Sequence, residues 1–185
     1  MTDRERLRAL LVERSVRVGD FTLASGAKSS YYIDARVTTM SAQGQRLVGI
    51  VGYELIRASG LEPTHVGGLT LGADPVAYAI AHRSALEGHP IDGFTVRKRA
   101  KDHGTGRRIE GGLPAAARCI VIEDTITTGR SALEAIEVVR AHGAAVVGVL
   151  ALVDRSTHAK TLLEGENLVL LSVFEARELV DSAHP

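Results

Sequence analysis

Only one of the 185 residues is a cysteine, Cys119, and none is a tryptophan. A disulfide within the chain is therefore excluded, and because Cys119 begins an apolar run we expect its thiol to be a small core group rather than a nucleophile. No apolar run reaches the length of a membrane span, and the first six residues are too polar for a signal peptide, so we expect a cytoplasmic protein with no membrane partner. Lysine plus arginine and aspartate plus glutamate both total 22, and this balance gives no overall field that would attract nucleic acid.

What the chain does contain is an alternation of apolar strands and helical patterns. At 185 residues and 45% hydrophobic content, residues 1–185 are expected to fold as one globular domain. The pattern favours the α/β class, with a central, mostly parallel sheet flanked by helices. Residues 21–23 and 31–33 predict two short strands outside any βαβ unit, so residues 1–40 are expected to add a small N-terminal hood, or cap. Helices are predicted at 3–14, 43–57, 75–86 and 175–180, and strands of the main sheet at 65–67, 92–98, 119–122, 144–153 and 168–174.

Residues 119–131, C-I-V-I-E-D-T-I-T-T-G-R-S, carry the strongest functional pattern. A buried parallel strand is predicted to end at two adjacent acids, Glu123 and Asp124. A loop rich in threonine and glycine then leads to a helix that is expected to begin at Ser131, which has the spacing of a capping box with Glu134. Because ligands of open α/β sheets bind beyond the carboxyl ends of the strands, this stretch predicts a binding site.

The residue types in this stretch fit a sugar phosphate. Backbone N–H groups and the positive end of the dipole at a helix N-terminus suit a phosphate, and Thr127, Thr128 and Ser131 add hydroxyl donors. Gly129 lets the backbone approach closely. The two carboxylates would repel that phosphate, so we expect them to accept hydrogen bonds from a vicinal diol or to help hold Mg²⁺. A phosphate site beside a diol site predicts that the stretch binds ribose 5-phosphate. Each residue taken alone also fits an ordinary strand-to-helix turn.

Two further loops contain residues that suit anions. Residues 68–75 form a second strand–glycine loop–helix unit, which fits an anion cradle and a simple turn equally well. Residues 97–108 contain six lysine or arginine side chains and His103, and Gly104 and Gly106 interrupt this run. We expect residues 99–113 to form a mobile lid over an anion, because loops of this length are often lids and because no aromatic side chain is present to stack on nucleic-acid bases. A solvated basic surface is the alternative.

Two isolated cations are also candidates. Arg155 follows a long apolar strand and is expected to face the same crevice as the acid pair, where a guanidinium can clamp a planar carboxylate. A salt bridge with Asp154 is the alternative. Lys28, in the turn at 24–30, is on its own more typical of a solvated turn cation.

Four motifs together resemble a known family: F-T-L-A-S-G-A-K-S-S-Y-Y, V-R-K-R-A-K-D-H-G, E-D-T-I-T-T-G-R-S and A-L-V-D-R. The third is similar to the PRPP-binding motif of the type I phosphoribosyltransferases. The lid motif and the terminal Asp-Arg resemble the members of that family that use orotate, and the four motifs sample residues 20–156 in the same order. The chain departs from some members at residues 71–74, L-G-A-D, where those members carry a lysine.

This resemblance implies the type I phosphoribosyltransferase fold and the transfer of the phosphoribosyl group of PRPP to orotate, giving orotidine 5′-monophosphate and pyrophosphate. It implies Mg²⁺ as cofactor, held mainly by PRPP and aided by Asp124 rather than by a cluster of protein ligands. It also implies a homodimer in which lid residues act across the interface, and no nucleic-acid partner. The alternatives are transfer to another base, such as uracil or a purine, and a PRPP-sensing regulator of the same fold that binds RNA.

The resemblance further assigns roles to individual residues. Lys101, His103 and Asp124 are implied as catalytic residues, and Lys28, Thr127 and Arg155 as orotate-binding residues. The implied PRPP-binding residues are Lys28, Arg97, Lys98, Lys101, His103, Glu123, Asp124, Thr125, Ile126, Thr127, Thr128, Gly129, Arg130 and Ser131.

Overall fold

The computed structural model describes residues 1–22, 26, 28–99, 108–156 and 158–183 of the chain. Its main sheet has the strand order β5-β4-β3-β6-β7-β8, and within the described residues every neighbouring pair is parallel except β4 with β5. This mostly parallel sheet with helices on its faces confirms the predicted fold class. The strands are β3 (His65–Leu69), β4 (Asp92–Val96), β5 (Ile109–Glu110), β6 (Arg118–Ile126), β7 (Ala145–Asp154) and β8 (Leu170–Glu175).

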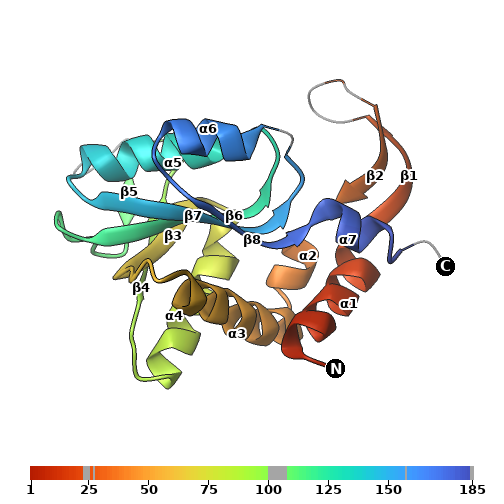
Figure 1. Cartoon of the computed structure of the whole chain (residues 1–185), viewed down its shortest axis with the longest axis horizontal. Coiled ribbons are helices and arrows are strands. Elements are labelled where there is room, and N and C mark those ends of the chain that lie inside the picture. Colours follow the sequence, from red (N-terminus) through yellow and green to blue (C-terminus); the bar gives the residue numbers. More distant parts are fainter. Residues whose placement is uncertain (23–25, 27, 100–107, 157, 184–185) are drawn as a thin grey trace.

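Helices cover both faces of this sheet (Figure 1). Along β6 the side chains alternate between the two faces, as they do in any strand. Ile120 and Ile122 belong to the core on one face, whereas Cys119 and Val121 belong to the core on the other. On the first face lie α3 (Ala42–Ser59) and α4 (Ala73–Leu86), and on the second lie α5 (Arg130–Ala141) and α6 (Ala159–Gly165).

Cys119 is a core residue, as predicted. Its side chain is fully buried, and burial raises the pKa of the thiol to about 12. Since the thiolate is the reactive form of cysteine, this residue is not a nucleophile at neutral pH.

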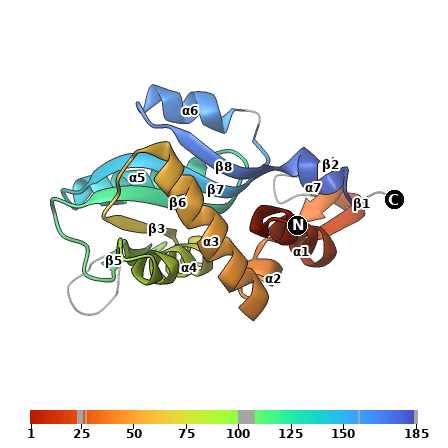
Figure 2. The same ribbon diagram turned by 60° about the horizontal axis from the view of Figure 1, so that its bottom comes forward.

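The predicted hood is an antiparallel hairpin that forms a separate two-stranded sheet. The hairpin stands beside α7 at one end of the main sheet (Figures 1 and 2). A hydrogen bond of 2.7 Å between the buried hydroxyls of Ser15 and Thr38 ties the end of α1 to α2. None of the helices in the described ranges is both long and apolar enough to cross a membrane. The elements of this part are α1 (Asp3–Ser15), β1 (Val16–Thr22), β2 (Lys28–Ile33), α2 (Arg36–Thr39) and the C-terminal α7 (Ala176–Val180).

Three short elements, α2, α6 and β5, of four, seven and two residues, were not predicted. β5 lies within the segment predicted as the lid. Ile109 and Glu110 pair with Val96 and Thr95 of β4, and Leu113 is buried in the core. The end of the predicted lid is therefore attached to the edge of the sheet.

Candidate active site

A pocket of about 250 Å³ opens at the carboxyl end of the sheet, where β3 and β6 lead into their helices. It lies where open α/β folds bind their ligands. The segments that line it come from the end of β2 through α2, from the loop after β3, from the end of β4 and from the 119–131 stretch. The lining residues are Tyr32, Ile33, Asp34, Ala35, Arg36, Leu69, Thr70, Leu71, Gly72, Ala73, Lys98, Glu123, Asp124, Thr125 and Ser131.

The acid pair lies within β6, and the prediction that the strand ends before it is wrong. Pairing with β7 continues through Glu123 to Ile126, because the long apolar β7 offers backbone partners as far as Asp154. Only residues 127–129 then separate the strand from α5. Both carboxyl groups nevertheless line the pocket, so the expected placement of Glu123 and Asp124 at one site holds.

Burial makes both acids weaker than usual. It raises the pKa of Glu123 to about 8, and the adjacent charge of Asp124 adds to this effect. Burial also raises the pKa of Asp124, whereas the backbone N–H of Thr125 and the positive charge of Arg36 lower it. Thr125 N–H donates to Oδ1 of Asp124 at 2.8 Å. With a pKa of about 8, Glu123 is protonated at pH 7, so the pair offers both a donor and acceptors, which suits two neighbouring hydroxyls.

At the beginning of α5 the N–H of Arg130 donates to Oγ1 of Thr128 at 3.4 Å, and the N-cap residue offers no side chain to the N–H groups that follow. The predicted capping box between Ser131 and Glu134 is wrong: the helix begins at Arg130 and no side chain caps it. Gly129 precedes it with φ of 78°, a left-handed conformation that favours glycine. Ser131 therefore lies in the first turn and lines the pocket, and Glu134 forms an ion pair with Arg108. An uncapped helix N-terminus with a hydroxyl beside it matches the predicted phosphate site.

The structure separates the cations implied for pyrophosphate. Lys98 lines the acid-pair pocket, but Arg97 lies in an adjacent hollow of about 580 Å³, where its Nη1 is 3.6 Å from Oε1 of Glu110. Lys98 borders both spaces. The two remaining candidates, Lys101 and His103, lie outside the described residues.

The cations implied for orotate do not line the acid-pair pocket. Arg155 was expected to face the same crevice as the acid pair but lines a separate pocket of about 330 Å³ together with Tyr31, and Lys28 begins β2. Lys28 Nζ donates to Oγ1 of Thr22 at 2.8 Å, within the hairpin. The guanidinium of Arg155 donates to Oγ of Ser29 at 3.2 Å and lies 4.8 Å from the ring centroid of Tyr31. Arg155 therefore joins the end of β7 to the hairpin.

The alternative role of Arg155, a salt bridge with Asp154, is not present among the described residues. The Asp154 carboxylate instead accepts hydrogen bonds from the backbone and hydroxyl of Ser156, at 2.8 and 2.7 Å. Because Asp154 is occupied in this way, the charge of Arg155 is left for a ligand.

Sequence reasoning missed several pocket residues. Asp34 and Arg36 had no role assigned, although both lie within four residues of the end of the N-terminal motif, and they form an ion pair on the pocket wall. The role of Gly72 was also missed: a Cβ atom at this position would lie 2.5 Å from Oδ1 of Asp124. The glycine in the second strand–loop–helix unit was the only signal that pointed to this close approach.

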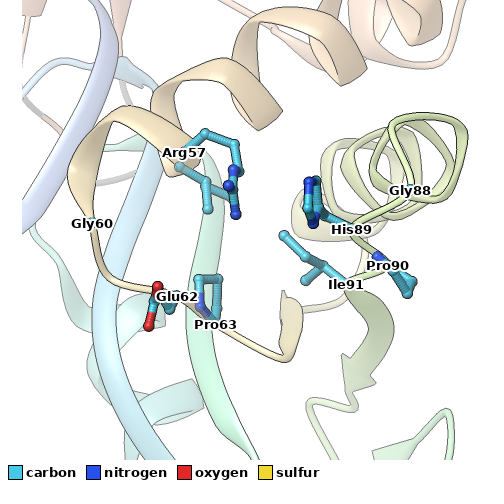
Figure 3. Close-up of a pocket in the computed structure, with 9 residues that line it drawn as sticks. Arg57, Gly60, Glu62, Pro63, Gly88, His89, Pro90 and Ile91 are labelled. Carbon is cyan, nitrogen blue, oxygen red and sulfur yellow. The ribbon is translucent and has the colours of Figure 1, made fainter.

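A larger pocket, of about 350 Å³, lies at the opposite end of β3 and β4 and lacks this chemistry. Figure 3 shows Arg57 and His89 approaching it from opposite sides. The ends of α3 and α4 border it, and a helix C-terminus carries partial negative charge, which disfavours a phosphate. The smaller pocket beside the acid pair is therefore the candidate active site.

Comparison with known proteins places the chain among close relatives. The phosphoribosyl transferase domain family matches residues 45–168. An orotate phosphoribosyltransferase of Aquifex aeolicus (strain VF5) is 44% identical over 183 residues, which cover 97% of this chain and 99% of the relative. The crystal structure of Mycobacterium tuberculosis H37Rv orotate phosphoribosyltransferase in complex with Fe(III) dicitrate has a TM-score of 0.85 and 45% identity, and the match covers 96% of this chain and 99% of that one. A structure of the same mycobacterial enzyme in complex with PRPP has a TM-score of 0.80 and 41% identity, covering 97% and 99%.

Proposed function

The chain belongs to the orotate phosphoribosyltransferases of the phosphoribosyltransferase family, and we propose that the pocket beside Glu123 and Asp124 is where it carries out their reaction. It transfers the phosphoribosyl group of PRPP to orotate, producing orotidine 5′-monophosphate and pyrophosphate for pyrimidine biosynthesis. The observation that carries the site assignment is the juxtaposition of a buried acid pair with the uncapped N-terminus of α5. These two features match the diol and the 5′-phosphate of one ribose 5-phosphate unit.

Binding of PRPP divides between these two features. The 5′-phosphate accepts hydrogen bonds from the first N–H groups of α5 and from the Ser131 hydroxyl, where the helix dipole also favours negative charge. Glu123 and Asp124 bind the ribose diol. Two-point attachment fixes the orientation of C1, the atom at which the bond to pyrophosphate breaks.

Catalysis then depends on charge stabilisation. As the bond from C1 to pyrophosphate breaks, positive charge develops on the ribose and negative charge on the leaving group. The Asp124 side chain stabilises the sugar, and Lys98, with Lys101 and His103 of the lid segment, stabilises the pyrophosphate. Orotate is already an anion, so the site has to position it rather than remove a proton from it. Arg155 binds its carboxylate on the hood side.

Mg²⁺ is proposed as the cofactor, held mainly by oxygens of PRPP. Within the part of the chain that the structure describes, no group of three or more histidine, cysteine, aspartate or glutamate side chains is arranged to hold a metal ion. The acid pair supplies hard oxygen ligands beside the diol, and such a site suits an ion that takes most of its ligands from a substrate phosphate. Asp124 is the residue that would assist, and the ion would neutralise charge on the leaving pyrophosphate.

A homodimer is proposed as the working unit. Four apolar side chains, each about half exposed, come from α2, from the loop after β3 and from α4: Val37, Met40, Leu71 and Tyr78. Exposed apolar side chains on neighbouring elements are typical of an interface. Tyr78 also borders the hollow that contains Arg97 and Arg99, where the lid segment begins. The lid thus starts beside the proposed interface, which supports its action on the partner's site.

Mixing two inactive variants tests this arrangement. If the lid acts across the interface, a dimer of one Lys101→Ala subunit and one Asp124→Asn subunit contains one intact site. Random reassembly of equal amounts should then restore about a quarter of the wild-type activity, because half of the dimers are mixed and each has one working site. No recovery in mixed dimers that form normally would show that Lys101 acts within its own subunit.

The reaction itself is tested by following orotate consumption through its ultraviolet absorbance. We expect consumption only when both PRPP and Mg²⁺ are present, and none with uracil, hypoxanthine or adenine. PRPP binding without turnover of any base would contradict the proposed function.

We also propose the cytoplasm as the site of action, since PRPP and orotate are anions that do not cross a bilayer unaided.

A further inference from the structure

The side chain of Arg36 is held in place and still has free donors. Its Nε donates to Oδ1 of Asp34 at 2.8 Å, and its Nη2 donates to Oδ2 at 2.9 Å. The backbone N–H of Arg36 also donates to Oδ1, at 3.1 Å. A guanidinium has five N–H donors in a planar fork. Asp34 occupies one edge of this fork, and the edge formed by Nη1 and Nη2 has no partner among the residues that the structure describes.

Arg36 is also fixed relative to the acid-pair pocket. Gln45 Nε2 donates to the carbonyl of Thr39 in α2 at 2.5 Å and to the carbonyl of Pro75 in α4 at 2.8 Å. These bonds fasten α2, which begins at Arg36, to the first turn of α4. The loop that leads into α4 lines the same pocket as Arg36, and the charge of Arg36 acts on Asp124 inside it.

The charges in the pocket leave one part of PRPP without enough partners. Its acidic and basic lining residues are three acids, Asp34, Glu123 and Asp124, and two cations, Arg36 and Lys98. The 5′-phosphate is bound by the start of α5 and the diol by the acid pair, but the pyrophosphate carries several negative charges beside those acids. Within the described part of this pocket, only Lys98 and Arg36 can balance them.

We propose that Arg36 binds the pyrophosphate group of PRPP through the free edge of its guanidinium, and that Asp34 is its positioning residue. This role rests on the proposed function and adds to it a residue outside the lid and the 119–131 stretch. A guanidinium edge matches two phosphate oxygens, as a lysine does not. Because Asp34 already restricts the Arg36 side chain, binding loses less side-chain entropy than it would with a mobile arginine.

Isothermal titration calorimetry with inorganic pyrophosphate in the presence of Mg²⁺ tests this assignment directly. We expect Arg36→Gln to weaken pyrophosphate binding about 10- to 100-fold, the range for a charge-assisted hydrogen bond to an ionised partner. Arg36→Lys should recover part of the loss, because it keeps the charge but not the fork. Asp34→Asn keeps one oxygen that can accept from the backbone N–H of Arg36 at the start of α2, but it removes the second acceptor and the negative charge. We expect this variant to weaken pyrophosphate binding by an amount between those of Arg36→Lys and Arg36→Gln.

Ribose 5-phosphate serves as the second ligand, since it contains the diol and the phosphate but no pyrophosphate. Its affinity should change much less than the affinity for pyrophosphate in all three variants, because Arg36 affects the diol site only through its charge on Asp124. A general distortion of the pocket would weaken both ligands alike. Arg6→Gln is the matched control, because Arg6 forms an ion pair with Asp3 at similar exposure but far from the pocket. Pyrophosphate binding by Arg36→Gln at wild-type strength would overturn the inference.

The two levels of failure can be told apart. A wild-type protein that does not consume orotate with PRPP and Mg²⁺ refutes the proposed function. An active wild type whose Arg36→Gln variant binds pyrophosphate normally refutes only the role of Arg36.

Discussion

Substituting Gly72 by alanine should impair catalysis through a single contact. A Cβ atom at this position would lie 2.5 Å from Oδ1 of Asp124, and ordinary contacts begin at about 3.4 Å. Gly72 has φ of −66° and ψ of −43°, which alanine adopts without strain, so the substitution changes the space and not the backbone preference. Either the Asp124 carboxylate or the loop after β3 must therefore move by about 1 Å, and a misplacement of that size in an active site costs roughly 10²-fold in rate.

The assay is kcat/KM for PRPP at saturating orotate, together with thermal unfolding. We expect about a 100-fold loss of kcat/KM with little change in Tm, because alanine is a good helix former at the start of α4. Gly165→Ala is the control: Gly165 lies in α6, and a Cβ there meets nothing within 4 Å. In an Asp124→Asn background the further effect of Gly72→Ala should be much smaller, because the two residues share one contact. Wild-type kcat/KM for Gly72→Ala would refute the argument.

Three other predictions concern individual site residues. Lys101→Ala should lower turnover about 10²- to 10³-fold without loss of folded protein, and near-wild-type turnover would refute its catalytic role. Arg155→Ala should raise KM for orotate much more than KM for PRPP, because the guanidinium serves the carboxylate; equal changes in both constants would contradict that division. The pKa of Glu123 is raised from its ordinary value of 4.5 to about 8, so between these pH values the folded protein binds more protons than the unfolded chain, and stability falls as pH rises. Chemical denaturation from pH 5 to pH 8 gives the free energy of unfolding at each pH, and in the wild type this free energy should fall by at most about 1.4 kcal/mol per pH unit because of Glu123. Glu123→Gln should remove this contribution. If the free energy of unfolding depends on pH identically in variant and wild type, Glu123 does not titrate in this range.

The 119–131 stretch shows how far local sequence can predict a site. The apolar run, the two acids and the glycine loop are adjacent in the chain, so their order alone placed a binding site at the end of β6. The exact end of that strand was not predictable, because it depends on β7, which begins almost 20 residues later and supplies the pairing partners through Asp154. Strand length is here a property of the sheet, whereas the kind of ligand follows from the local residues.

Arg36 shows what local sequence does not predict. The spacing of Asp34 and Arg36 fits an ion pair anywhere on a surface, and only the packing of α2 against α4 brings that pair to the pocket. The same holds for Gly72, whose closeness to Asp124 joins residues about 50 positions apart. Contacts between segments that are distant in the chain can be found only from the three-dimensional structure, because no local periodicity or motif predicts them.

The contacts around Asp124 form one physical unit. Burial raises the pKa of this carboxyl and so disfavours the ionised form, which stabilises the developing charge on the ribose better than a neutral acid does. The N–H of Thr125 holds one oxygen, Gly72 leaves space for it, and the charge of Arg36 favours its ionised form. The four residues come from β6, from the loop after β3 and from α2, which have little in common except that they meet at the carboxyl end of the sheet. The fold therefore does more than gather ligands for PRPP: around a buried acid it places a backbone donor and a cation that oppose the effect of burial, at the point where the reaction generates positive charge.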